Sequence, residues 1–196
     1  MRTDTTDVNT LPVTAPVRDA AAEHIELLTG SPDTPMHFRV FPDDKKSADK
    51  FGQDFYGTVA EVWPEIQNWQ SQGCGVFVIP NEGGANDAAI THIRTLFIDM
   101  DGQHPPERWH VQPDFFVERD DLHRHAYWLV ADCPVAEFKT AQRRLAACYG
   151  SDPKVCNPSR VMRLAGTLHL KEPAHPRHIT VEDCTLLGSG KPHTLA

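Results

Sequence analysis

The chain contains the stretch Thr95-Leu-Phe-Ile-Asp-Met-Asp-Gly102, in which a short apolar run ends in two carboxylates one residue apart. A run of this length, closed by a polar turn, is typical of a buried strand. Side chains at positions i and i+2 of a strand point to one face, so Asp99 and Asp101 should lie side by side. Two such carboxylates can bind divalent ions spaced about 3.5 to 4 Å apart, which supports displacement at phosphorus. The stretch therefore predicts phosphoryl or nucleotidyl transfer.

Two other interpretations of this stretch stay open. Asp and Gly are frequent in turns, so Asp-Met-Asp-Gly can be simply the polar end of a core strand. An apolar strand followed by Asp-x-Asp-Gly-Thr is also typical of haloacid dehalogenase-type phosphatases, in which the first Asp is a phosphorylated nucleophile. Here Gln103 replaces the Thr, and almost a hundred residues precede a motif that normally opens that domain. The downstream residues must decide between these interpretations.

Length and composition indicate an ordinary globular chain. Its 196 residues suffice for one domain, or one compact domain of two lobes, with a sizeable core. No apolar run approaches the ~20 residues that span a bilayer, and the polar N-terminus lacks the apolar part of a signal peptide. We therefore expect a cytoplasmic protein with no membrane partner. The five cysteines form no close pair and no helical His-x-x-x-His site is present, so neither disulfides nor zinc are expected.

The net charge of −8 hides an uneven distribution along the chain. Residues 1–121 contain 9 Lys and Arg against 21 Asp and Glu, whereas residues 122–196 contain 10 against 6. Within residues 139–171 there are seven basic residues, and Asp152 is the only acid. A basic face can bind a polyanion although the whole molecule is acidic. The C-terminal part is therefore a candidate nucleic-acid surface, and a solvated basic helix with its loop is the alternative.

The pattern of apolar and turn-forming residues predicts a mixed α/β (α+β) chain. Residues 1–17 show no periodicity and are expected to be a flexible leader, with residues 18–196 forming a single domain. No Walker-type Gly-Lys-Ser/Thr motif is present, so no helicase domain is expected. Pro64 should kink or split the second helix. We expect helices over residues 18–29, 55–72 and 133–149, and strands over residues 36–41, 75–79, 95–101, 115–118, 125–130 and 178–182.

Three further features follow the two carboxylates. His125 lies in a predicted strand, Asp152 follows a predicted helix, and a basic run extends over Ser159-Arg-Val-Met-Arg-Leu-Ala-Gly-Thr-Leu-His-Leu-Lys171. A two-metal nucleotidyl transferase needs a third carboxylate for its ions and cationic groups for the triphosphate and the leaving pyrophosphate. The chain offers both in a suitable order.

With these segments the chain resembles the RepB-like primase domain of the archaeo-eukaryotic primase (AEP) superfamily, the primase-polymerases of plasmids, phages and integrated elements. The resemblance extends over about residues 38–171. Its segments are Asn-Trp-Gln-Ser-Gln-Gly-Cys-Gly-Val-Phe-Val (68–78), Leu-Phe-Ile-Asp-Met-Asp-Gly (96–102), His-Ala-Tyr-Trp-Leu-Val (125–130) and Ser-Arg-Val-Met-Arg-Leu (159–164). It implies a modified RNA-recognition-motif-like catalytic lobe, a small α/β lobe and a mixed or antiparallel sheet.

The resemblance also implies roles for individual residues. Asp99, Asp101 and Asp152 would be the catalytic carboxylates, and together they would bind two Mg²⁺ or Mn²⁺ ions. His125 would be the histidine of the second family motif, where it can donate a hydrogen bond to a phosphate oxygen. Each role has a plainer alternative, since Asp152 precedes Pro153 in a common turn sequence and His125 can be a core histidine.

The basic residues of the C-terminal part receive two kinds of role. By the resemblance, Arg160, Arg163 and Lys171 would bind the nucleotide with His125, although Arg163 can instead form a structural ion pair. The helix pattern places Arg143 and Arg144 on the outer side of the third predicted helix, where they are expected to contact DNA.

The sequence departs from the family pattern at two places. Arg119-Asp-Asp-Leu122 occupies the position of the usual Thr-Ser-Pro-Gly, so a hydroxyl contact to the nucleotide is lost or replaced. Ala165 stands where Arg-Leu-Pro-Gly normally has its Pro, which is expected to change the stiffness of the loop.

The main hypothesis is thus a template-directed nucleotidyl transferase that makes primers, with NTPs or dNTPs, a single-stranded DNA template and a replicative helicase in trans as partners. The first alternative is a non-catalytic module that binds single strands or an origin. The second is a phosphatase with Asp99 as its nucleophile.

Overall fold

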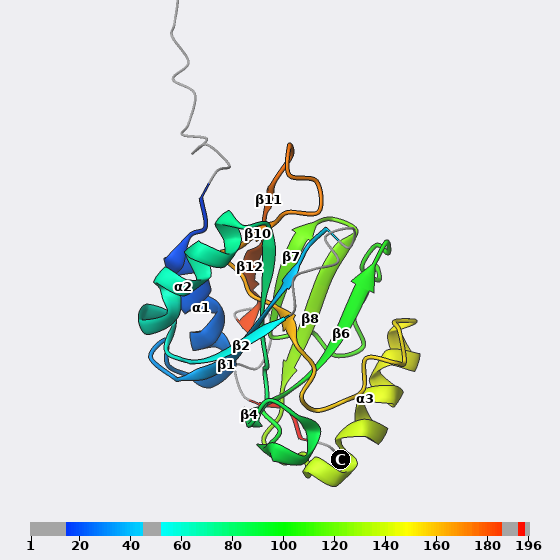
Figure 1. Cartoon of the computed structure of the whole chain (residues 1–196). Coiled ribbons are helices and arrows are strands. Elements are labelled where there is room, and N and C mark those ends of the chain that lie inside the picture. The colour runs from blue at the N-terminus through cyan, green and yellow to red at the C-terminus, as the bar shows by residue number, and fades with distance from the viewer. Residues whose placement is uncertain (1–14, 45–51, 186–191, 195–196) are drawn as a thin grey trace, which may run out of the picture.

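The computed structural model describes residues 15–44, 52–185 and 192–194 (Figure 1). Residues 1–14 of the expected leader lie outside the described residues. The described chain forms two four-stranded antiparallel sheets, two short ribbons and three α-helices. This architecture confirms the α+β class and the antiparallel pairing expected from the sequence.

The first sheet belongs mainly to the N-terminal half, and the second to the central part of the chain. In spatial order, the first sheet contains β2 (Gln53–Gly57), β1 (Met36–Pro42), β3 (Cys74–Val78) and β9 (Met162–Arg163). The second sheet contains β12 (Thr180–Asp183), β7 (Phe115–Asp120), β8 (His123–Leu129) and β6 (Thr95–Asp101). The ribbons pair β10 (Leu168–His169) with β11 (Arg177–His178) and β4 (Glu82–Gly83) with β5 (Ile90–His92).

The helices are α1 (Arg18–Thr29), α2 (Val59–Ser71) and α3 (Val135–Tyr149), with a short 3-10 turn at Asp87–Ala89. Helix α2 packs on β3, α1 contacts α2 and β12, and α3 lies beside β6 (Figure 1). The first and third helices confirm the predictions from periodicity and from the glycines that end them, although α3 begins after Pro134 rather than at residue 133. None of the helices described is long and apolar enough to cross a membrane.

The predicted start of the second helix is wrong. Phe55 lies in β2, where it pairs with Phe38 of β1. The helix begins after Thr58, because Thr58 and Glu61 form a capping box in which each side chain accepts from the other's backbone N–H. Pro64 lies inside α2, and the helix is not split there.

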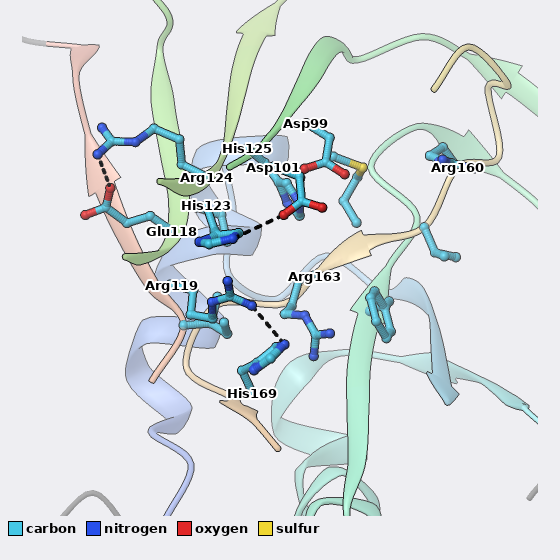
Figure 2. Close-up of a pocket in the computed structure, with 15 residues that line it drawn as sticks. Asp99, Asp101, Glu118, Arg119, His123, Arg124, His125, Arg160, Arg163 and His169 are labelled. Atoms are coloured by element: carbon cyan, nitrogen blue, oxygen red, sulfur yellow. Dashed lines mark hydrogen bonds and ion pairs between the residues drawn. The ribbon is translucent and has the colours of Figure 1, made fainter. Parts of the chain in front are cut away.

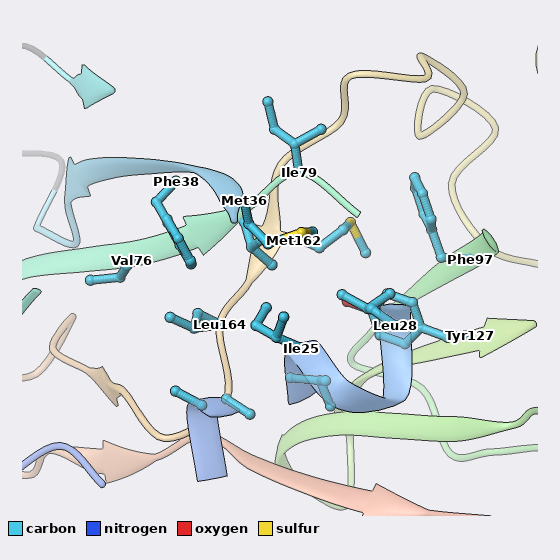
Figure 3. Close-up of a cluster of buried hydrophobic side chains, with 14 of the residues drawn as sticks. Ile25, Leu28, Met36, Phe38, Val76, Ile79, Phe97, Tyr127, Met162 and Leu164 are labelled. Carbon is cyan, nitrogen blue, oxygen red and sulfur yellow. The ribbon is translucent and has the colours of Figure 1, made fainter. Parts of the chain in front are cut away.

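One hydrophobic core joins the two sheets. Ile25 and Leu28 of α1 lie between Phe38 of the first sheet and Phe97 and Tyr127 of the second (Figure 3). All five side chains are at most 3% exposed. The two sheets therefore pack as one unit, which fixes the space between them.

Strand β6 is the last strand of the second sheet, and α3 covers its open edge. Gln142 of α3 is fully buried, its Oε1 accepts from the Phe97 N–H at 3.2 Å, and its Nε2 donates to the Phe97 carbonyl. An edge strand otherwise presents unpaired backbone groups. Ile98 and Met100 alternate with Asp99 and Asp101 along β6, so they point to the opposite face of the sheet. There they pack in a second apolar cluster with Trp128. Together these contacts fix the orientation of the strand that ends in the two carboxylates.

Candidate active site

A cavity of about 290 Å³ lies between the two sheets (Figure 2). Phe77 of β3 and Arg163 of β9 line one side of it, and residues of β6, β7 and β8 line the other. The cavity thus joins segments that are far apart in the sequence.

Asp99 and Asp101 both line this cavity, as the alternation along the strand predicted. In the register of β6 and β8, Asp99 is opposite His125 and Asp101 is opposite His123. Asp99 Oδ1 lies 3.6 Å from His125 Nε2, and Asp101 Oδ1 lies 3.2 Å from His123 Nε2. The Asp99 side chain is 41% exposed and that of Asp101 is 83% exposed, so both carboxylates are open to a ligand.

His125 lines the same cavity, where burial disfavours its charged form. Burial lowers the pKa of His125 below its ordinary value, Asp99 opposes this effect, and the charges of Arg163 and Arg160 reinforce it. A neutral imidazole carries one N–H donor, which is the group that the predicted contact to a phosphate oxygen requires.

Cationic side chains line the part of the cavity away from the carboxylates. Arg119 Nη1 lies 3.0 Å from His169 Nε2; in Figure 2 Arg119 lies to the left of Arg163 and His169 lies below the two. Burial and the neighbouring Arg163 lower the pKa of His169 to about 4, with Asp43 opposing and Arg119 and Lys171 adding to the effect. One cavity therefore holds two carboxylates at one end and, at the other, the Arg119 guanidinium beside a neutral His169.

Arg163 is held in a fixed orientation by Asp43. Its Nη1 and Nη2 donate to the two Asp43 carboxylate oxygens at 3.2 and 2.9 Å, and its guanidinium lies 4.5 Å from the Phe77 ring centroid. A side chain at position 75 would collide with both charged groups, so Gly75 is the residue that fits. A guanidinium has five N–H donors, and Asp43 uses two of them. The predicted nucleotide contact and the structural ion pair are therefore compatible.

Arg160 reaches the cavity from an anchored loop. Ser159 donates to Asp87 through its backbone N–H and its hydroxyl, at 3.1 and 2.6 Å. Asn81 donates to the Pro158 carbonyl at 3.0 Å and accepts from the Thr95 N–H at the start of β6. The loop and the carboxylate strand are thus tied to the same asparagine.

Four residues with predicted roles do not line this cavity. Asp152 is exposed and accepts from the Lys154 N–H at 2.8 Å, in a loop whose Gly150 carbonyl accepts from Gln103. Lys171 lines a smaller neighbouring cavity. The remaining two residues, both exposed on α3, are Arg143 and Arg144.

The carboxylates that the cavity brings together suit a hard divalent cation. Over the described ranges, no group of three His, Cys, Asp or Glu side chains lies close enough together to hold a metal, so Asp152 is not joined to Asp99 and Asp101 in this arrangement. Mg²⁺ usually binds proteins through one or two carboxylates, with water and substrate phosphates completing its coordination. Two open carboxylates in one cavity with Arg160 and Arg163 fit that requirement.

The sequence reasoning missed four residues of the site. Alternation along β8 places His123 on the face of His125, so the strand pattern contained the signal for it. Arg119 was noted only as a departure from the family pattern, and His169 only as part of the basic run. No local pattern pointed to Asp43, because its partner Arg163 is 120 residues away.

Comparisons with known proteins agree with this geometry. No protein-family model matches the chain, and no curated protein matches it. Among solved structures, the AEP domain of the cyanophage S-2L primase-polymerase has a TM-score of 0.72 and 26% identity, covering 92% of this chain and 95% of that one. Primase RepB′ has a TM-score of 0.63 and 18% identity, covering 89% of this chain and 57% of that one.

A third similar structure is the catalytic domain of primase RepB′ in complex with initiator DNA. Its TM-score is 0.57 at 18% identity, and the match covers 88% of this chain and 85% of that one. The resemblance inferred from the motifs is confirmed: the chain has the fold of the RepB-like primase-polymerase catalytic domain.

Proposed function

We propose that this chain is a divalent-metal-dependent, template-directed nucleotidyl transferase that synthesises primers in plasmid, phage or mobile-element replication. The proposal rests mainly on one observation: Asp99 and Asp101 line the same cavity as Arg160 and Arg163. Carboxylates that can bind metal ions, next to cations that can bind phosphates, are the parts that phosphoryl chemistry needs. The likeness to primase domains supports the same reaction class.

Asp99 and Asp101 would hold Mg²⁺ or Mn²⁺, with Asp152 as the predicted third carboxylate. Bound divalent ions supply charge neutralisation at the reacting phosphate and make a hydroxyl easier to deprotonate. Arg163, fixed by Asp43, binds phosphate oxygens with its remaining donors, and Arg160 adds a second cation.

The reaction transfers a nucleotidyl group. The 3′-oxygen of the growing strand forms a bond to the α-phosphorus while the bond from that phosphorus to the bridging oxygen breaks. Pyrophosphate leaves with the electron pair, and the hydroxyl proton passes to solvent. His125 donates its N–H to a phosphate oxygen, and Arg163 stabilises the negative charge that grows on the leaving group.

Single-stranded DNA is the proposed template, with Arg143 and Arg144 as contacts on the outer side of α3. The crystallised RepB′ catalytic domain was bound to initiator DNA, which supports DNA as the partner here. A replicative helicase acting in trans and a cytoplasmic location belong to the same proposal.

An incorporation assay tests this function against its alternatives. Purified protein is incubated with a single-stranded template and labelled NTPs or dNTPs, with Mg²⁺, with Mn²⁺, or with a chelator. Template-dependent product and pyrophosphate that disappear with the chelator support the proposal. If the protein binds the single strand but forms no product, the alternative of a non-catalytic DNA-binding module is favoured. Template-independent release of inorganic phosphate would favour the phosphatase, which none of the three similar structures supports.

A further inference from the structure

Behind the active-site cavity, two histidines and a tyrosine are neighbours in the core. His24 of α1 is fully buried, and its ring centroid lies 5.8 Å from that of Tyr127, which is on β8 beside α1 (Figure 3). His125 is two residues before Tyr127 on the same face of the strand, and its ring centroid lies 6.4 Å from that of the tyrosine. Tyr127 is thus next to both the buried histidine of α1 and the histidine that lines the cavity.

Each of these three side chains has one buried polar atom with no hydrogen-bond partner among the described residues. The atoms are His24 Nε2, Tyr127 Oη and His125 Nδ1. A buried polar atom that forms no hydrogen bond destabilises the folded state, so such atoms are rare. Three of them on neighbouring rings indicate that they are partners of one another, either directly or through one buried water.

The ring proton of His24 has only one possible position. The Ala165 N–H donates to His24 Nδ1 at 3.2 Å, so this nitrogen is an acceptor. Burial, with the charge of His125 adding to it, lowers the pKa of His24 to about 3, so the ring is neutral near neutral pH. A neutral imidazole has one acceptor nitrogen and one N–H. The N–H of His24 is therefore at Nε2, where it is a donor that needs an acceptor.

The Tyr127 hydroxyl can be that acceptor and can donate in turn to His125. A hydroxyl accepts through its lone pairs and donates its own proton. Burial raises the pKa of Tyr127 well above its ordinary value, and the charge of Asp99 adds to this effect, so the hydroxyl keeps its proton. When its oxygen accepts from His24, its proton is free for His125 Nδ1. The single N–H of a neutral His125 is then at Nε2.

We propose that His24 and Tyr127 are positioning residues that fix the tautomer of His125. The hydrogen bonds run in one direction, from the Ala165 N–H through His24 and Tyr127 to His125 Nδ1. His125 Nε2, which lies 3.6 Å from Asp99 Oδ1, then offers its N–H to a phosphate oxygen. The opposite tautomer would turn a lone pair toward the phosphate, which repels it. Only this last contact rests on the proposed function, because the tautomer is a property of the folded chain.

NMR of the protein labelled with ¹⁵N-histidine reads the tautomer directly, because protonated and unprotonated ring nitrogens have well-separated resonances. Spectra are recorded at about pH 8, above the ordinary pKa of histidine. The variant His125→Gln identifies the His125 signals by their loss. In the wild type we expect the His125 proton at Nε2.

Two variants break the proposed hydrogen bonds at different places. Tyr127→Phe removes only the hydroxyl, and His24→Asn keeps an acceptor for the Ala165 N–H but has no atom at the position of Nε2. Each should change His125 to a mixture of both tautomers. The control Tyr149→Phe removes a hydroxyl that contacts the backbone of Val111 instead, so it should leave the His125 signals unchanged.

Nucleotide affinity gives a second measurement, which a purely structural role would not change in the same way. Displacement of a fluorescent nucleotide in Mg²⁺ buffer should show an affinity about threefold lower for Tyr127→Phe, because only part of the His125 population keeps the donor at Nε2. In the background of His125→Gln, Tyr127→Phe should have no further effect, since glutamine has no tautomer to fix. An equal loss in both backgrounds would contradict the positioning role.

The NMR result alone can overturn the proposal. A wild-type His125 with its proton at Nδ1, or a tautomer unchanged in both Tyr127→Phe and His24→Asn, would do so. If one of these variants does not fold, the other carries the test. A wild type that incorporates nucleotides while its tautomer does not respond removes only the positioning role. A tautomer that responds as expected in a protein that incorporates nothing removes only the transferase.

Discussion

Asp43 determines where the Arg163 guanidinium can be. The Asp43 side chain is 5% exposed, and besides Arg163 it accepts from the Leu170 N–H at 2.7 Å. Removing one partner of a buried ion pair leaves a charge without compensation, which is far more costly than breaking a surface pair. The contact with Asp43 therefore holds Arg163 in position for its proposed role in phosphate binding.

The variant Asp43→Asn tests whether Asp43 positions Arg163. An amide offers one oxygen where the fork needs two, so we expect a loss of about 3 kcal/mol in the free energy of unfolding. Triphosphate affinity should fall by about tenfold because Arg163 is no longer held. Urea titration and nucleotide displacement measure the two effects. The control is Asp54→Asn, which breaks the more exposed pair with Arg39 and should cost less than about 1 kcal/mol. Equal behaviour of the two variants would contradict the positioning role.

At position 165, where the resemblance leads one to expect proline, the structure shows an alanine whose backbone N–H is used by His24. The Ala165 N–H donates to His24 Nδ1 at 3.2 Å, and a proline would have no N–H to give. His24 is fully buried against Phe115 and Tyr127. Burial, reinforced by the charge of His125, lowers the pKa of His24 to about 3.

This buried imidazole predicts acid sensitivity. An unfolded histidine takes up a proton below about pH 6.5, whereas the folded form does not until about pH 3. The stabilising contribution is thus complete above pH 6.5 and is lost as the pH falls, by about 2 kcal/mol between pH 7 and pH 5. In His24→Asn, whose amide oxygen can accept from Ala165, the change in unfolding free energy between these pH values should be smaller by that amount. A slope equal to that of the wild type would refute the assignment.

Local patterns account for part of the site. The spacing of Asp99 and Asp101 within one strand was enough to place both in the cavity, and the same rule applied to β8 would have added His123. Asp43 could not be found in this way, since its contact with Arg163 joins β9 to the loop after β1. Such contacts depend on tertiary packing and have no sequence period.

At the element scale, the predicted helices and strands were those with strong local signals. Helix α1 ends at Gly30, which has φ 82°, and α3 ends at Gly150, which has φ 68°, both in the left-handed conformation that favours glycine. The start of α2 was missed because Phe55 continues the helical spacing of Val59 by chance, while the Thr58 capping box overrides it.

The hydrogen bonds between α3 and β6 give a testable prediction about stability. Gln142→Ala would leave the buried N–H and C=O of Phe97 without partners, which should cost about 2 to 3 kcal/mol of unfolding free energy. Urea denaturation measures this loss. Arg143→Ala, the exposed neighbour on the same helix, is the matched control and should change stability by less than about 0.5 kcal/mol. A loss below that value for Gln142→Ala would show that the edge contact is dispensable.

The proposed DNA contacts, Arg143 and Arg144, lie on the outer face of α3. Neutralising Arg143 and Arg144 together should reduce the slope of log K against log salt by about 1 to 2 units, at ~0.7 for each phosphate contact on a single strand. Fluorescence anisotropy across a salt series gives the slope. An unchanged slope would remove this helix from the binding surface and leave the loop of Arg160.

At the scale of the whole molecule, the active-site cavity exists because one core packs two antiparallel sheets against each other. Periodicity cannot predict this arrangement, since β9 joins a sheet whose other strands end 84 residues earlier, at Val78. The order of the motifs, through its resemblance to the RepB-like primase domain, did predict a fold of two lobes. Neither predicted that Arg119, at the end of β7 where the sequence departs from the family pattern, lines the same cavity.

The central claim is that Asp99 and Asp101 make this cavity a nucleotidyl transferase site. The most direct test compares template-dependent incorporation by the wild type, Asp99→Asn, Asp101→Asn and the exposed control Asp33→Asn in Mg²⁺ and in Mn²⁺. An amide keeps the shape but removes the charge, so each site variant should lose activity by ~10³-fold or more while its melting temperature stays unchanged. The control should remain fully active. Near-wild-type incorporation by either site variant would contradict the account.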